Sequence, residues 1–95
     1  MTTVVNIYKE PYDVYIGRAG KQLDGYFGNP FKYGSRYKNV EDFQKYFIER
    51  MESDEEYYKR IHALRGKRLG CFCHPQYCHG DIIADYLNQS YPEAL

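Results

Sequence analysis

Three cysteines and two histidines crowd into ten residues of this chain, from Gly70 to His79. They are all of its cysteines and two of its three histidines. Thiolates and imidazoles are the ligands that tetrahedral zinc prefers in proteins. The stretch therefore predicts a candidate zinc site with the ligand set Cys71, Cys73, Cys78 and His79, and with His74 as a spare. Structural zinc sites usually join two ligand pairs across a longer loop, so other uses of the cluster stay open.

A second interpretation is a catalytic thiol. Cys78 stands at the start of a helical pattern, where the positive end of the helix dipole and a nearby histidine, His79 or His74, would lower the pKa of a thiol. Cys78 would then be the nucleophile. A buried free cysteine can instead behave as a small apolar residue. We favour this structural interpretation for Cys71 and Cys73.

A third interpretation is a ligand pocket without covalent chemistry. The N–H groups at the start of the last helix suit an anion such as phosphate. Asp81 falls in the first turn of that helix. It either caps the helix or, as a pocket carboxylate, binds a ribose hydroxyl or acts as a base. The sequence leaves both roles open.

The elements that must position these residues form an α/β fold in one domain, residues 1–95. Strands are expected over residues 2–8 and 13–16, as antiparallel neighbours across a short turn, and over 67–73. Helices are expected after Asn39 as the N-cap, after Ser53 in a capping box, and over the apolar stripe that contains Ile83 and Leu87. We expect one small sheet of about three strands, mixed in direction, with helices packed on it.

This order brings the candidate residues to one edge of the sheet. A strand, a helical crossover and a second strand form a parallel pair, so the strands over 13–16 and 67–73 end at the same edge. Arg18 follows the first strand and the Cys/His stretch follows the second. The carboxyl edge of the sheet is where α/β proteins bind ligands.

Composition narrows the class of protein. The 95 residues carry 13 basic and 13 acidic side chains, for a formal net charge of zero. No segment approaches the roughly 20 apolar residues of a membrane span, and the first residues lack a signal-peptide pattern. An odd number of cysteines argues against a disulfide scaffold. We therefore expect a cytoplasmic protein without a membrane partner.

The charge is unevenly distributed along the chain. Residues 17–39 hold five basic side chains against one acid, in a glycine-rich segment that predicts a long loop. Tyrosines alternate with the basic residues between Lys21 and Lys38, a pattern that suits base stacking and phosphate contacts. For most of the twelve tyrosines we favour a half-buried structural role instead. Zero net charge argues against strong nonspecific DNA binding.

Three segments of the sequence, Tyr15 to Arg18, Gly28 to Phe31 and Cys71 to Asp81, follow one another in a recognisable order. Over nearly its whole length the chain resembles a family of bacteriophage and bacterial proteins, domain of unknown function 4326. The resemblance implies a compact α/β fold with the three motifs gathered at one site, and host cytoplasm as the location if a phage encodes the protein. The residues to which it points are Arg18, Asn29, Cys71, Cys73, Cys78, His79 and Asp81, with Gly17, Gly28 and Gly80 where the backbone turns tightly or approaches a ligand.

The leading hypothesis is a small protein that binds a nucleotide-like or otherwise phosphorylated ligand at the sheet edge, with enzymatic processing of that ligand left open. Arg18 and the helix N-terminus would hold phosphate, and Asn29 would orient the ligand. Acid, base or nucleophilic chemistry would come from Cys78, His79 and Asp81. The alternative is a zinc-stabilised module that binds nucleic acid or protein through the basic loop.

Overall fold

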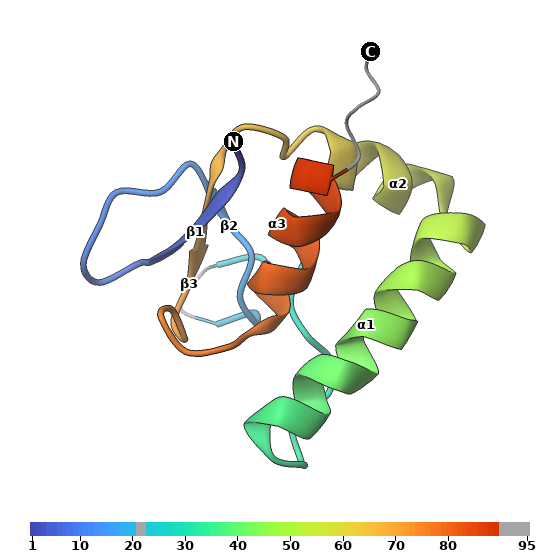
Figure 1. Cartoon of the computed structure of the whole chain (residues 1–95), viewed down its shortest axis with the longest axis horizontal. Helices are drawn as coiled ribbons and strands as arrows, with labels where there is room; N and C mark the ends of the chain where they lie inside the picture. The colour runs from blue at the N-terminus through green and yellow to red at the C-terminus, as the bar shows by residue number, and fades with distance from the viewer. Residues whose placement is uncertain (21–22, 90–95) are drawn as a thin grey trace.

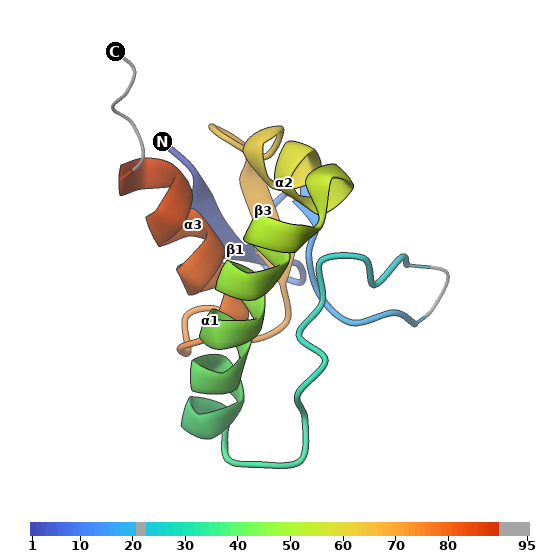
Figure 2. The ribbon, with the colours of Figure 1, turned by 90° about the vertical axis from the view of Figure 1, so that its right-hand side faces the viewer.

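The computed structural model describes residues 1–20 and 23–89, so Lys21, at one end of the predicted basic loop, lies outside the described residues. Its elements run in the order β1 (Thr3–Asn6), β2 (Val14–Tyr15), α1 (Arg36–Ser53), α2 (Glu55–His62), β3 (Arg68–Cys71) and α3 (His79–Gln89). Figures 1 and 2 show the helices together on one side of a small sheet. The predicted α/β class is confirmed.

The sheet has the strand order β1-β3-β2, and both outer strands are parallel to β3. The register pairs Val5 with Gly70 on one side of β3 and Tyr15 with the same Gly70 on the other. The carboxyl ends of all three strands therefore lie at one edge. The sheet is parallel rather than mixed.

The connection between β1 and β2 also differs from the predicted antiparallel turn. It must cross β3, because β1 and β2 lie on opposite sides of that strand. At its two ends, Ile7 donates to the Cys71 carbonyl at 3.2 Å and Asp13 donates to the Arg68 carbonyl at 2.9 Å. A crossover usually needs a longer link. Here residues 7–13 suffice, because four residues of strand rise only about 13 Å, whereas seven extended residues reach about 24 Å.

Gly70 makes this tight crossover possible. A Cβ atom at Gly70 would lie 2.7 Å from the Tyr12 ring and 2.8 Å from Ile7 Cγ2. The missing side chain is thus the space in which the link crosses the face of the sheet away from the helices. Figure 1 shows this blue link on that side.

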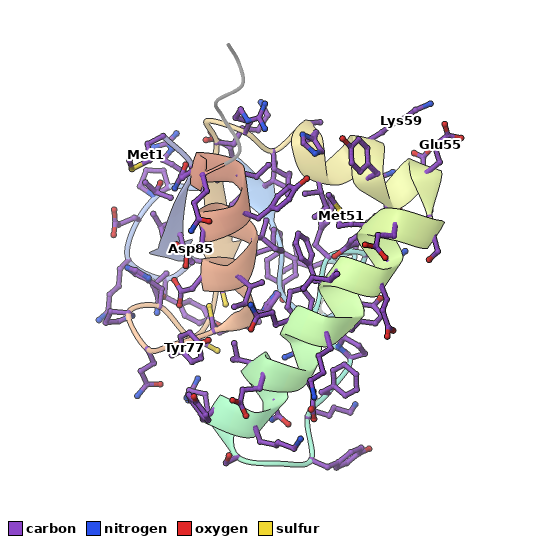
Figure 3. The ribbon with its side chains drawn as sticks, turned by 45° about the vertical axis from the view of Figure 1, so that its right-hand side comes forward. Met1, Met51, Glu55, Lys59, Tyr77 and Asp85 are labelled. Carbon is purple, nitrogen blue, oxygen red and sulfur yellow. The ribbon has the colours of Figure 1, made fainter. Side chains whose placement is uncertain are left out.

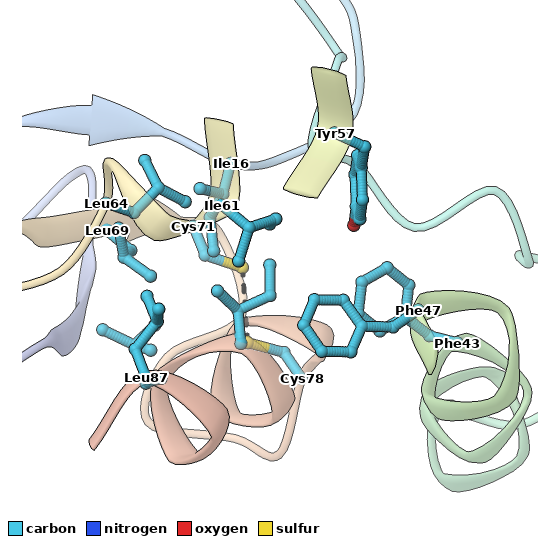
Figure 4. Packing of buried hydrophobic residues seen from close by; sticks show 13 residues of the cluster. Ile16, Phe43, Phe47, Tyr57, Ile61, Leu64, Leu69, Cys71, Cys78 and Leu87 are labelled. Atoms are coloured by element: carbon cyan, nitrogen blue, oxygen red, sulfur yellow. Dashed lines mark hydrogen bonds between the residues drawn. The ribbon is translucent and has the colours of Figure 1, made fainter. Parts of the chain in front are cut away.

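The opposite face of the sheet packs against the helices in one core. Val4 of β1, Leu69 of β3 and Ile16, which follows β2, belong to the same buried cluster as apolar residues of every helix. Figure 4 shows Ile16 and Leu69 in a close view of this cluster. The helical members are Phe43, Phe47, Tyr57, Ile61, Ile83, Ala84 and Leu87. This single buried cluster fixes the start of α3 against the ends of the strands.

Helix α1 begins one turn earlier than predicted. Its N-cap is Ser35, whose hydroxyl accepts a hydrogen bond from the Lys38 N–H at 3.1 Å. Asn39, the predicted cap, lies inside the helix, and its side chain instead exchanges two 3.1 Å hydrogen bonds with the backbone of Gly34. Arg36 is consequently the first helical residue rather than a loop residue.

The predicted capping box at Ser53 is also wrong. Ser53 is the last residue of α1, and its hydroxyl donates to the Glu49 carbonyl at 2.9 Å. Asp54 caps α2 instead, accepting from the Tyr57 N–H at 3.0 Å. The sequence offers two capping residues in succession, and the one nearer to the acidic first turn of α2 takes the role.

The segment between β2 and α1 is a loop, as predicted, and aromatic packing holds it to the helices. Tyr26 contacts Tyr57 with ring centroids 6.0 Å apart. The guanidinium of Arg50 lies 4.1 Å from the centre of the Tyr57 ring and 5.0 Å from that of Tyr26, while Arg60 lies 4.4 Å from Tyr26. Cation–π contacts of this kind stabilise a packed loop.

Strand β3 ends at Cys71, two residues before the predicted end. The Cys73 N–H turns back toward Cys71 Sγ at 3.5 Å, and Gln76 donates to the Cys73 carbonyl at 2.8 Å. Cys73 is therefore part of a turn and not of the strand. Among the described residues, no helix is both long and apolar enough to cross a membrane.

The crossover predicts a steric cost at Gly70. We expect Gly70→Ala to lower the free energy of unfolding by about 1–3 kcal/mol, because the added methyl group overlaps Tyr12 and Ile7. Gly34→Ala is the control, since its Cβ would meet side-chain atoms at 3.2 Å or more. Urea denaturation measures both. Equal stability of the Gly70→Ala variant and the wild type would contradict this placement of the link.

The reassigned cap of α2 gives a matched pair of variants. We expect Asp54→Ala to lower the urea midpoint more than Ser53→Ala, because Asp54 caps α2 and pairs with Arg50 at 3.1 Å. The Tyr57 N–H and Arg50 lower the pKa of Asp54 from 3.8. Its contribution is thus complete above the unfolded pKa and is lost as the pH falls through the folded pKa. A larger effect of Ser53→Ala at neutral pH would contradict the assignment.

Candidate functional site

A cleft of about 690 Å³ opens at the carboxyl edge of the sheet. Its lining comes from the ends of all three strands, the long loop, the start of α1 and the turn before α3. The polar and aromatic members are Tyr8, Tyr15, Arg18, Asn29, Lys32, Arg36, Asn39, Cys71, Phe72, Cys73, Tyr77, Cys78 and His79. The segments that the sequence placed at one edge therefore do meet there.

The cleft is positively charged. Arg18, Lys32 and Arg36 line it, and none of its described lining residues is Asp or Glu. Arg18 is held in place by the loop, since its Nε donates to the Asn29 carbonyl at 3.1 Å and its Nη2 to the Phe31 carbonyl at 2.9 Å. These bonds use two of the five donors of a guanidinium and leave three.

Aromatic rings form one wall. Phe72 lies between Tyr8 and Tyr15, with ring centroids 5.6 and 5.9 Å away. The Tyr15 hydroxyl donates to the Arg18 carbonyl at 2.7 Å, which links this wall to the cationic loop. Phe72 is 43% exposed and Tyr8 71% exposed, so both rings present surface to a ligand. Across the cleft, Tyr77, which Figure 3 labels in the turn before α3, contacts Tyr37.

A buried group of two thiols and an imidazole borders the cleft. The sulfurs of Cys71 and Cys78 lie 3.5 Å apart, and both side chains are buried (Figure 4). His79 is also buried, and its Nε2 lies 2.6 Å from the Ile16 carbonyl oxygen. A carbonyl only accepts, so Nε2 carries the proton and Nδ1 keeps a lone pair. One ligand atom from each residue lies within 4.8 Å of the other two, so the group could hold a metal ion.

The contact between the two thiols shifts their pKa values in opposite directions. Cys71 and Cys78 share one S–H···S hydrogen bond, and this contact lowers the pKa of Cys71. The same contact, together with burial, raises the pKa of Cys78, for which the sequence predicted a lowered value. Burial also raises the pKa of Cys73 and lowers that of His79. Cys71, predicted to be a plain apolar residue, thus shares a buried hydrogen bond with the other thiol.

The predicted zinc set is only partly gathered. Cys71, Cys78 and His79 lie together, but Cys73 lies outside that group, with its thiol near both Cys71 and the Arg36 guanidinium. His74 lies in the turn between β3 and α3, where its carbonyl accepts from Asn6 Nδ2 at 2.8 Å. The same amide donates to the Phe72 carbonyl at 3.2 Å, so Asn6 ties the end of β1 to this turn.

Asp81 lies in the first turn of α3 and is not among the residues that line the cleft. Its Oδ2 accepts from the Cys78 N–H at 3.0 Å, and its own N–H donates to the Cys78 carbonyl at 3.0 Å. This reciprocal pattern is that of a helix cap. Between the two roles that the sequence left open, the geometry favours the cap.

Asn29, Gly28 and Gly80 serve the packing around the site. Asn29 is buried and lines the cleft, but its amide donates to the Asn39 carbonyl at 3.0 Å and accepts from Phe31 at 2.9 Å. A Cβ atom at Gly28 would lie 2.7 Å from the Gly17 carbonyl oxygen, and one at Gly80 would lie 2.8 Å from Ile16 Cδ1. These glycines let protein segments approach one another closely.

Sequence reasoning did not assign Lys32, Arg36, Phe72, Tyr8 or Tyr15 to the site, although all five line the cleft. The basic block over residues 17–39 was the available signal for the two cations. For the three aromatic residues the sequence carried no such signal, because aromatic residues at strand ends are also typical of the core. Exposure in the structure identifies Phe72 and Tyr8 as surface for a ligand.

Comparisons with known proteins agree on a single group. Over 90 residues the chain is 44% identical to a protein of Enterobacteria phage T4, described as an uncharacterized 12.4 kDa protein in the nrdA-td intergenic region. The match covers 95% of this chain and 81% of the phage protein, whereas no solved structure matches. The family model described as Domain of unknown function (DUF4326) matches residues 4–89. The chain belongs to the DUF4326 family, as its three motifs suggested.

Proposed function

We propose that the cleft binds a phosphorylated, nucleotide-like small molecule. The observation that carries the proposal is the charge of the lining, which has three cationic side chains and, among its described members, no carboxylate. An anion placed there meets attraction without a neighbouring acid to repel it. The cleft also lies at the carboxyl edge of a parallel sheet, where ligands bind in folds of this class.

The cations are arranged for a phosphate group. Arg18 is oriented by two carbonyls of the loop, so little side-chain entropy is lost when it binds. Arg36 stands in the first turn of α1, and Cys78 and His79 stand at the start of α3. The free N–H groups at helix N-termini favour phosphate.

The aromatic wall supports a planar group at the other end of the ligand. Phe72 and Tyr8 are exposed at the cleft, and stacking on such rings contributes about 1–3 kcal/mol for a nucleobase. A nucleotide can pair its phosphate with the cations and stack its base on the rings, whereas a sugar phosphate can pair only with the cations. Any processing of the ligand would draw on Cys71, Cys78 and His79, because these groups border the cleft and Asp81 does not.

Calorimetric titration with AMP tests the proposal. We expect Arg36→Gln to weaken AMP binding by about 10- to 100-fold, because a hydrogen bond to a charged group contributes about 1.5–3 kcal/mol. Binding should also weaken as salt is raised, since the attraction is partly screened. Lys45→Gln is the control, because Lys45 is an exposed residue of α1 that is not part of the lining.

The same calorimetric titration is carried out with ribose 5-phosphate, which lacks the base, and with adenosine. Adenosine should bind more weakly than AMP because it lacks the phosphate. Absence of stabilisation by any phosphorylated compound at millimolar concentration would refute the proposal. So would an equal loss of AMP affinity in Lys45→Gln and Arg36→Gln.

The alternative, a zinc-stabilised binding module, is favoured by one observation, the group of Cys71, Cys78 and His79. We propose zinc as the metal for that group because two thiolates and an imidazole are zinc ligands. The buried core spans the sheet and every helix, so we expect the fold to persist in chelator. Far-UV circular dichroism in EDTA distinguishes the two cases: loss of the helical signal at room temperature would support the zinc-stabilised module.

A further inference from the structure

The buried thiol pair has a spacing close to that of two sulfurs on one metal ion. Zinc–sulfur bonds of about 2.3 Å in a tetrahedron place two sulfurs about 3.8 Å apart. Cys71 Sγ and Cys78 Sγ lie 3.5 Å apart without a metal between them. A shift of a few tenths of an ångström therefore brings both sulfurs to one ion.

His79 is oriented in the manner of a metal ligand. Its Nε2–H donates to the Ile16 carbonyl, which leaves the Nδ1 lone pair for coordination. Metal-bound histidines almost always donate their second ring nitrogen to a carbonyl, a carboxylate or water, and this second bond fixes the ring. The ring also packs against Phe43 in a T-shaped arrangement, at a centroid distance of 5.1 Å.

Within residues 1–20 and 23–89, no fourth protein ligand joins this group. The ligand atoms of Cys71, Cys78 and His79 form one group, and Cys73 is not part of it. The Cys73 N–H faces Cys71 Sγ at 3.5 Å, and the Cys73 thiol lies near both Cys71 and Arg36. Three protein ligands with an open position are typical of zinc sites that bind substrate, whereas closed structural sites have four.

The open position of such a site would face the cleft, because all three ligand residues line it. We propose that Cys71, Cys78 and His79 form a three-ligand zinc site whose fourth position opens into the cleft. This inference rests on the proposed function, because a donor atom of the bound ligand fills the fourth position. The metal is then part of the ligand site, together with Arg18 and Arg36. Zinc binding as a dithiolate releases the thiol protons to solvent.

Metal titration of the reduced protein tests the ligand set. We expect one Zn²⁺ or Co²⁺ per chain, and we expect Cys71→Ser and Cys78→Ser each to weaken binding by more than the roughly 10- to 100-fold that loss of an outer-shell partner costs. Cys73→Ser is the matched control and should change metal affinity less than about threefold, because Cys73 lies outside the group. Circular dichroism in chelator shows whether each variant is folded.

Two results would overturn this part of the inference. One is the absence of stoichiometric metal binding by the folded wild type. The other is a loss of affinity in Cys73→Ser as large as that in Cys78→Ser, which would mean a closed four-ligand site. If Cys78→Ser does not fold, the Cys73→Ser comparison with the wild type still decides between an open and a closed site.

The visible spectrum of the Co²⁺ protein tests the fourth position. Imidazole, a small neutral donor, should shift the bands of an open site irrespective of the cations of the cleft. AMP should shift them in the wild type at concentrations that saturate binding, and in Arg36→Gln only at about 10- to 100-fold higher concentration. A spectrum that neither compound changes would overturn the open site, while calorimetric AMP binding by the same protein would leave the proposed function intact. A response to imidazole alone, without AMP binding, would refute the proposed function and leave the open metal site standing.

Discussion

The hydrogen bond from His79 Nε2 to the Ile16 carbonyl joins residues 63 positions apart and fixes the geometry of the site. Ile16 follows β2, and His79 begins α3, so the bond attaches the start of the helix to the end of the strand. Gly80 allows the close approach that this bond requires, because any Cβ there would collide with Ile16. A buried hydrogen bond of this kind is costly to break, since both groups would lose a partner away from water.

Several features of the cleft follow from that attachment. Cys78 immediately precedes His79 and is thereby placed against Cys71 at the end of β3. Arg18 follows Ile16 by two residues and projects from the same edge. The loop beyond it is held by Asn29, which ties to α1 through the Asn39 carbonyl. The cationic side chains and the thiols consequently border one cavity, although they come from distant parts of the sequence.

The sequence predicted the edge of the sheet and the class of fold, because hydrophobic periodicity and the order of elements determine both. It did not predict the crossover of β1 and β2, whose feasibility depends on short strands and on the space at Gly70. It predicted a lowered pKa for Cys78, because the position at the helix start is visible in the sequence, whereas the contact with Cys71, which raises that pKa, is not. The number of basic residues in a segment does not show which of them are available to a ligand. Arg50 and Arg60 pack on aromatic rings, whereas Arg18 and Arg36 line the cleft.

The early start of α1 at Arg36 has an electrostatic consequence. Residues from the first turns of both α1 and α3 line the cleft, so the amino-terminal ends of two helices face it. Each end is equivalent to about half of a positive charge. At α3 the capping carboxylate of Asp81 offsets this partial charge, whereas the first turn of α1 holds no acid. The partial charge at α1 belongs to the backbone, so neither pH nor replacement of a side chain removes it. The protein thus maintains an attraction for anions that is built into this helix, while the arginines determine where in the cleft an anion comes to rest.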